Sequence, residues 1–256
     1  MSGAPDGPPF KAFRAGFGVP WLGARWIVAH QEAWPLVAAP AALHAVLGAA
    51  VLWLCFVVVP AWFRSALPAP EGASYLLWLI PYLLLIAAVL VAGLVVVYVV
   101  GGLLLLPFVD LLSRQVERVE VGGAPDDDGW RDVARDLLQS VAHSLLAAGL
   151  WLVGNLLLML LYAVPVLGEL LHMAGGAMLS ALLIARELID APLSRRRLGF
   201  WAKLAVLRRH LWYWWGAGAV TGLLLFVPFL NLVVLPAAVA GATLVHLRHE
   251  SGQAKG

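Results

Sequence analysis

The chain has 256 residues, of which 62% are apolar and 12% are charged, and its formal net charge is +2. Soluble domains contain about 25% charged residues, so the composition excludes an ordinary water-soluble domain. The small net charge argues against a nucleic-acid binder, and the single cysteine, Cys55, argues against a disulfide scaffold. The composition predicts a protein whose solvent is the lipid bilayer.

The first residues predict a disordered leader followed by a helix in the membrane interface. Residues 1–9 hold five glycines and prolines and the charged Asp6, without the hydrophobic segment of a cleavable signal. In residues 10–21, aromatic side chains recur on one helical face with basic side chains beside them, as in helices that lie among lipid headgroups. These residues are Phe10, Lys11, Phe13, Arg14, Phe17 and Trp21.

Long uncharged stretches predict the membrane-spanning part, and they lie at 33–63, 72–109, 137–168, 170–185 and 210–247. About 20 apolar residues of helix cross the bilayer core, so the first two stretches predict two long transmembrane helices. Pro165 and Pro228 interrupt the others and predict two proline-tipped helical hairpins. Their arms are expected near 141–164 and 170–185, and near 211–227 and 232–247. The predicted fold class is an all-α integral membrane protein, with interfacial amphipathic helices at 10–21, 130–141 and 198–211.

Basic residues predict the orientation of the chain. Of 17 lysines and arginines, 16 fall on one side of this arrangement, and only Arg64 lies between the first two spans. Because cytoplasmic loops carry the excess of basic residues, both termini are expected in the cytoplasm. Residues 10–248 are expected to form a single membrane domain, followed by a short polar tail at 249–256.

Glu169 leaves the depth of the first hairpin open. The arm that follows it has 16 uncharged residues, or about 24 Å of helix. If the hairpin stops partway, Glu169 lies inside the bilayer and needs a partner or a wet cavity. If the hairpin crosses, Glu169 is solvated at the far interface, which is the alternative we favour.

The sequence lacks patterns for catalysis or for a cofactor. There is no glycine-rich phosphate loop, no zinc-type Cys/His spacing and no nucleophile elbow. We therefore expect neither an enzyme nor a bound cofactor or metal. His246 and His249 lie three residues apart and fit either a metal-ligand pair or two interfacial histidines, and we favour the latter.

Arginines near helix ends are the candidate anion-binding residues. No arginine lies inside an apolar stretch, so an anion path would depend on helix ends and on arginines at the cytoplasmic mouth. The candidates are Arg25, Arg208 and Arg209. The basic stretch 195–209 fits recruitment of anions, binding of anionic headgroups or a topology signal, and its Lys203 is expected to snorkel to the headgroups.

A motif in the second half of the chain carries a family resemblance. It begins with Asp190-Ala-Pro192 and continues through Pro228-Phe-Leu-Asn231 and Pro236 to Gly241-Ala-Thr, and Pro107-Phe108-x-Asp110 precedes it. This order resembles the CysZ-type sulfate permease family, the bacterial branch of the etoposide-induced membrane protein superfamily, over roughly residues 10–248. The resemblance implies two long spanning helices, two shorter hairpins that either cross or only partly penetrate the membrane, a homo-oligomer in the bacterial inner membrane, and sulfate entry.

One stretch departs from the family. Sulfate permeases of this family carry a Gly-Leu/Ile-Arg motif just before the first span, where backbone amides and an arginine suit a dianion. Here the stretch reads Gln31-Glu32-Ala33-Trp34-Pro35, and Glu32 would repel sulfate. Arg25, about two turns earlier, is the candidate substitute. The resemblance therefore implies a transporter of a small anion such as sulfate, and the alternative is a non-transporting scaffold that organises lipids or other membrane proteins.

Overall fold

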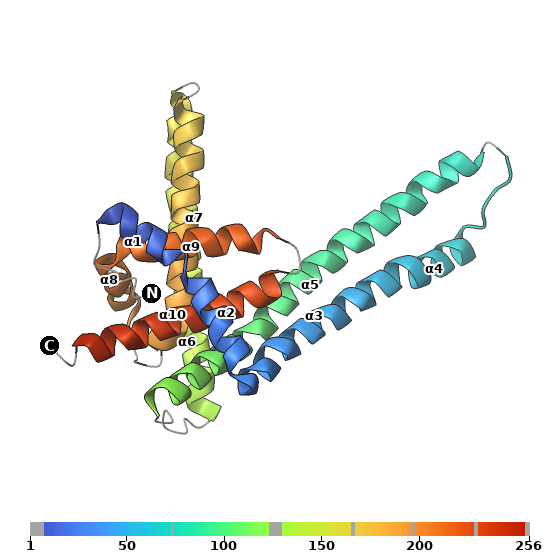
Figure 1. Cartoon of the computed structure of the whole chain (residues 1–256). Coiled ribbons are helices and arrows are strands. Elements are labelled where there is room, and N and C mark those ends of the chain that lie inside the picture. Colours follow the sequence, from blue (N-terminus) through green and yellow to red (C-terminus); the bar gives the residue numbers. More distant parts are fainter. Residues whose placement is uncertain are drawn as a thin grey trace. The chain divides into compact units, whose positions relative to one another are not determined.

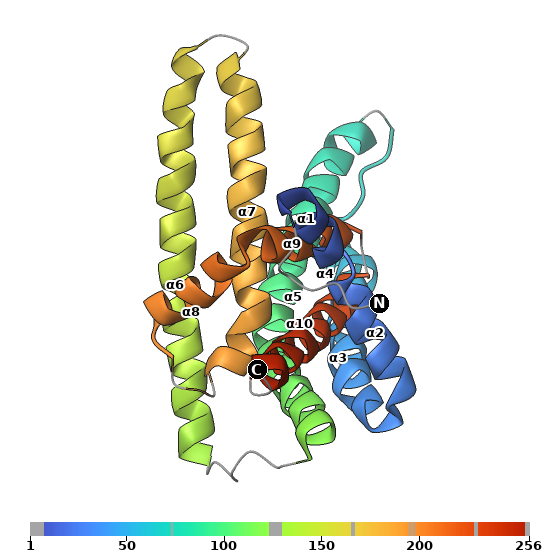
Figure 2. The same ribbon diagram turned by 60° about the vertical axis from the view of Figure 1, so that its left-hand side comes forward.

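A computed structural model describes residues 8–72, 74–122, 130–164, 167–194, 196, 198–227 and 230–253, and for 130–137, 139–140, 194, 231 and 250–253 it describes the backbone alone. All secondary structure in these ranges is helical. The first half contains α1 (Pro9–Gly16), α2 (Val19–Ala29), a 3₁₀ turn (Gln31–Ala33), α3 (Trp34–Trp53), a π-helical turn (Leu54–Val58), α4 (Val59–Ala66) and α5 (Ser74–Val121). The second half contains α6 (Trp130–Met159), a 3₁₀ turn (Leu160–Ala163), α7 (Leu167–Ser194), α8 (Phe200–Arg209), α9 (Leu211–Leu225) and α10 (Asn231–Gln253) (Figures 1 and 2).

Within the described residues, five helical segments are long and apolar enough to cross a membrane. They are Gln31–Ala66, Ser74–Val121, Val141–Ala163, Leu167–Leu193 and Leu232–His249. This confirms the predicted all-α integral membrane class. The chain divides into two compact units, residues 38–108 and residues 1–37 with 109–256.

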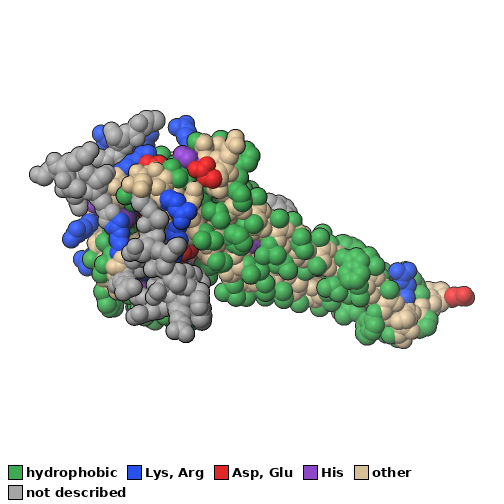
Figure 3. Space-filling view, turned by 90° about the horizontal axis from the view of Figure 1, so that it is seen from below, with side chains coloured by type: hydrophobic (Ala, Val, Ile, Leu, Met, Phe, Trp, Pro, Cys, Tyr) green, Lys and Arg blue, Asp and Glu red, His purple; other side chains and the backbone are tan. Residues whose placement is uncertain are grey.

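The unit of residues 38–108 is a pair of long helices joined by a turn. It holds most of α3, the π-helical turn, α4 and the first part of α5, with Val51 of α3 packed on Gly93 of α5. Apolar side chains such as Leu77 and Leu84 are 71% and 64% exposed. In Figure 3 the surface of this pair is mostly hydrophobic, and charge gathers near the turn between α4 and α5. Such a surface suits contact with lipid, because its side chains are apolar and each helix satisfies its own backbone hydrogen bonds.

The other unit is held together mainly by contacts among α1, α2, α6, α7, α9 and α10. α10 lies along α2, while α9 packs against α7 and α1. The approach of α2 to α10 requires two glycines, since a Cβ atom on Gly23 would lie 1.8 Å from the carbonyl oxygen of Ala237 and one on Gly241 would lie 2.0 Å from that of Val19. Small residues at such crossings let two backbones approach within van der Waals contact.

The two predicted hairpins differ in length. α6 and α7 run antiparallel with 30 and 28 residues (Figure 2), and each contains a segment that can cross a membrane. α9 has 15 residues, or about 22 Å of helix, which is short for a crossing. The arms α9 and α10 make fewer contacts with each other than α10 makes with α2, so α10 packs mainly on α2. The tip prolines Pro165 and Pro228 lie outside the described residues.

α7 is longer than its uncharged stretch predicts. The helix continues through Arg186 and Asp190 to Ser194, because these charges pair with each other inside the protein. The expected arm of 170–185 is therefore too short. Glu169 is exposed in the first turn of α7, and the length of the helix favours the alternative in which Glu169 is solvated.

The interfacial helices differ from expectation in three places. The stretch 10–21 is divided between α1 and α2, with a turn at Phe17-Gly18. The stretch 130–141 is continuous with the rest of α6. α8 forms within 198–211, but Lys203 does not reach toward headgroups: only 1% of it is exposed. The snorkelling prediction for Lys203 was wrong, because a buried carboxylate binds its ammonium group.

Candidate functional site

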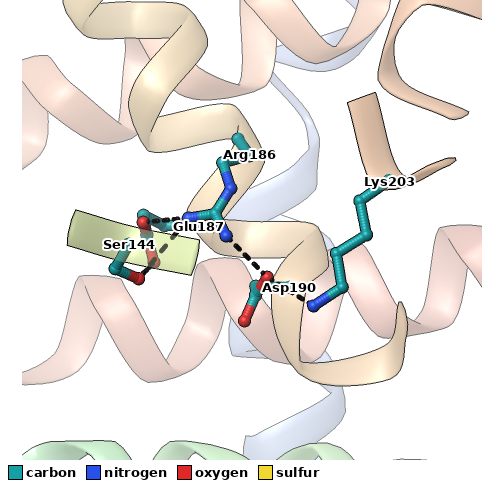
Figure 4. A network of polar contacts seen from close by, with 5 residues as sticks. All are labelled: Ser144, Arg186, Glu187, Asp190 and Lys203. Atoms are coloured by element: carbon teal, nitrogen blue, oxygen red, sulfur yellow. Dashed lines mark hydrogen bonds and ion pairs between the residues drawn. The ribbon is translucent and has the colours of Figure 1, made fainter. Parts of the chain in front are cut away.

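A cluster of charged side chains lies where α7 meets α6 and α8. Arg186 and Asp190 stand one helical turn apart on α7, and Arg186 Nη2 donates to Asp190 Oδ1 over 3.0 Å. Lys203 Nζ, from α8, donates to the same oxygen over 2.9 Å (Figure 4). The three side chains are 5%, 5% and 1% exposed. Charges at such depth cost several kcal/mol each unless they are paired, so each ion requires the others.

Glu187 and Ser144 extend the cluster toward α6. Arg186 Nη1 donates to Glu187 Oε1 over 2.5 Å and to Ser144 Oγ over 3.4 Å. Ser144 Oγ donates to Glu187 Oε2 over 3.2 Å. The Glu187 side chain is 38% exposed, unlike that of Asp190. Glu187 therefore stands at the accessible side of the cluster and Asp190 at its closed side.

The cluster has hydrogen-bonding capacity to spare. Arg186 Nε and His143 Nδ1 are buried and have no hydrogen-bond partner. The ring of Phe200 lies 5.5 Å from the Arg186 guanidinium carbon and contacts His143 edge-on, which suits a cation over an aromatic face. Arg186 and Lys203 balance Glu187 and Asp190 in formal charge. The arrangement places a guanidinium, an ammonium and a hydroxyl among largely apolar helices.

The predicted anion-binding arginines lie outside this cluster. Arg25 is exposed on α2, and Arg208 and Arg209 are exposed in the last turn of α8, where the helix dipole favours cations. α2 and α8 share no extensive contact, so the structure does not bring Arg25 to the other two.

Sequence reasoning missed four residues of the buried cluster, which are Ser144, Arg186, Glu187 and Lys203. The one local signal for the buried cluster was the spacing of Arg186 and Asp190, which are four residues apart.

The family-motif residues have varied surroundings. Asp190 belongs to the cluster, Gly241 lies at the crossing with α2, and Pro192 and Pro236 are fully buried. Asp110 accepts a hydrogen bond from Arg114 Nε over 2.8 Å, while Pro107 is exposed and Phe108 half-buried. Pro228 and the side chain of Asn231 lie outside the described residues.

His249 of α10 pairs with a histidine in the turn between α8 and α9. His249 Nε2 lies 2.8 Å from His210 Nε2, so one imidazole donates to the other. In the described part of the chain, no group of three or more His, Cys, Asp or Glu side chains is placed to hold a metal ion.

The apolar helices and the buried ion cluster define a multi-pass α-helical membrane protein with a polar centre at one end of a hairpin. A family model described as sulfate transporter CysZ/etoposide-induced protein 2.4 matches residues 19–236. The chain belongs to this family.

Curated relatives agree with this assignment. Sulfate transporter CysZ of Pectobacterium atrosepticum is 30% identical over 207 residues, which cover 80% of this chain and 74% of the relative. The protein of the same name from Pseudomonas aeruginosa is 31% identical and covers 75% of this chain and 78% of its own. That of Salmonella typhimurium is 27% identical, with 80% and 81% covered.

Proposed function

We propose that this protein transports sulfate, or a small anion of similar charge, across the bacterial inner membrane. The relatives are named as sulfate transporters, and the observation that carries the proposal for this chain is its buried ion cluster. Arg186 and Lys203 are two buried cations in a body whose other charges lie mostly at helix ends. Nothing in the fold or the comparisons favours the scaffold alternative.

In this proposal the cluster recognises the anion in place of the missing family motif. Because Glu32 stands where the motif has glycine, the approach to the first span offers no obvious dianion site. A guanidinium presents several fixed donors to a tetrahedral oxyanion, and Ser144 adds a hydroxyl from a second helix. We therefore assign recognition of the anion to the region of Arg186.

The exposed arginines would act at an earlier step. Arg25, Arg208 and Arg209 are exposed, and cations near a pore mouth raise the local concentration of anions and their rate of entry. They attract sulfate in this proposal, whereas Arg186 binds it.

The proposal includes an assembly. Residues 10–248 act as one membrane domain with both termini in the cytoplasm, and several copies form the pore. Two features support a homo-oligomer. α9 is short for a crossing of its own, and much apolar surface of the hairpins is exposed.

Reconstitution tests the proposed transport. Purified protein in liposomes should take up radiolabelled sulfate faster than empty liposomes, and unlabelled sulfate should compete. Arg186→Lys keeps the charge but replaces two separated donors, Nη1 and Nη2, with one nitrogen, so uptake should fall about tenfold. Arg118→Lys, a change at an exposed arginine, is the matched control. Uptake equal to that of empty liposomes, from correctly inserted protein, would favour the scaffold.

A further inference from the structure

We propose that the carboxylate of Glu187 is a tethered competitor of the transported anion: it occupies an oxyanion site formed by Arg186 and Ser144, and sulfate displaces it. This inference rests on the proposed transport of sulfate. It identifies the anion-binding site and the carboxylate that occupies this site when no sulfate is bound.

The contacts of Glu187 are those that an oxyanion would make. One carboxylate oxygen accepts from Arg186 Nη1 and the other from Ser144 Oγ, so two donors from two helices converge on one anionic group. A sulfate oxygen pair has the same charge type and acceptor geometry as a carboxylate and can take the same two donors.

Solvent exposure indicates which of the two carboxylates can move away from Arg186. Glu187 is 38% exposed, whereas Asp190 is 5% exposed and is held by both Arg186 and Lys203. Rotation of the Glu187 side chain toward the exposed side frees the Arg186 Nη1 position without breaking the bonds of Asp190. This movement takes one negative charge away from Arg186, which favours entry of an anion.

The cluster also has hydrogen-bonding groups that Glu187 leaves unused. Arg186 is 5% exposed, and its Nε has no partner. His143, the neighbour of Ser144 on α6, has a buried Nδ1 without a partner. A carboxylate presents two oxygens and sulfate presents four, so sulfate can satisfy more of this donor set than Glu187 does.

A tethered competitor lowers apparent affinity, because the site is free only for the fraction of time that Glu187 is displaced. Glu187→Gln removes the charge and keeps the shape and the capacity to bond with Ser144. We expect this variant to bind radiolabelled sulfate with a Kd about threefold to tenfold lower than that of the wild type. Glu169→Gln, the same change at the exposed tip of α7, should leave Kd unchanged.

Binding is measured on purified full-length protein in nanodiscs, with thermal stability recorded for each variant. Glu187→Asp, which shortens the reach of the carboxylate by one methylene, should give an intermediate Kd and serves if the glutamine variant is poorly folded. Wild-type binding with no tightening in either folded variant would overturn the inference and leave the proposed transport intact. If neither wild type nor variants bind or take up sulfate, both proposals fall.

Discussion

Lys203 Nζ lies 2.9 Å from Asp190 Oδ1, and this bond fastens α8 to α7. The ammonium group reaches a carboxylate 13 residues earlier in the chain, in surroundings that exclude water from both. Arg186 shares the same carboxylate oxygen. The position of α8, and with it that of the exposed Arg208 and Arg209, therefore depends on a buried ionic contact.

Lys203→Met should destabilise the protein. The substitution keeps most of the side-chain volume but removes a buried cation that binds Asp190, which should cost about 3 kcal/mol of unfolding free energy. Thermal unfolding in detergent measures the change. Arg208→Met on the same helix is exposed and should change stability little, and Asp190→Asn combined with Lys203→Met should recover part of the loss. Equal stability of Lys203→Met and wild type would contradict the buried pair.

Gly23→Ala should separate α2 from α10. Its Cβ atom would lie 1.8 Å from the carbonyl oxygen of Ala237, so the backbones must move apart and the core between them loses contacts. We expect a loss of about 2 kcal/mol or more, measured by thermal unfolding. Gly149→Ala on α6 meets no atom within 4 Å and should be neutral or stabilise by up to about 1 kcal/mol. Similar effects of the two substitutions would refute the close crossing.

The orientation can be tested at the end of α4. Cys55, the single native cysteine, is fully buried and should give little background with a thiol reagent. A Ser65→Cys variant places a thiol at an exposed position, and an impermeant reagent added from the periplasmic side should label it. Labelling that appears only after lysis would reverse the predicted topology.

The exposed arginines should influence the rate of sulfate entry in a salt-dependent way. Arg25→Ala or Arg208→Ala should slow uptake a few-fold at about 10 mM ionic strength, where the Debye length is about 30 Å. The difference should shrink at about 150 mM, where it is about 8 Å. The measurement is initial uptake by proteoliposomes at both ionic strengths. A loss of uptake that is the same in both would instead indicate direct binding by the arginine.

Much of the helical organisation was predictable, because a membrane span is recorded locally in a run of apolar residues. The runs around 33–63 and 72–109 correspond to the helical segments Gln31–Ala66 and Ser74–Val121. The length of α7 was not predictable in this way, because counting uncharged residues stops at Arg186 and the helix does not. A charged residue marks the end of a buried helix only if it must face water, and the guanidinium of Arg186 instead faces Asp190.

The sequence by itself determined the solvent of this protein, its all-α class, the number of long apolar stretches and its family, since these depend on composition and on short motifs. Only the tertiary structure decided which charges are buried together. Ser144 and Arg186 are 42 residues apart, and Lys203 belongs to an amphipathic pattern that fits the headgroup region equally well. The physical reason is that a basic side chain on an amphipathic helix can be stabilised either by water at the interface or by a buried carboxylate. Which of the two stabilises it depends on the helix that packs beside it.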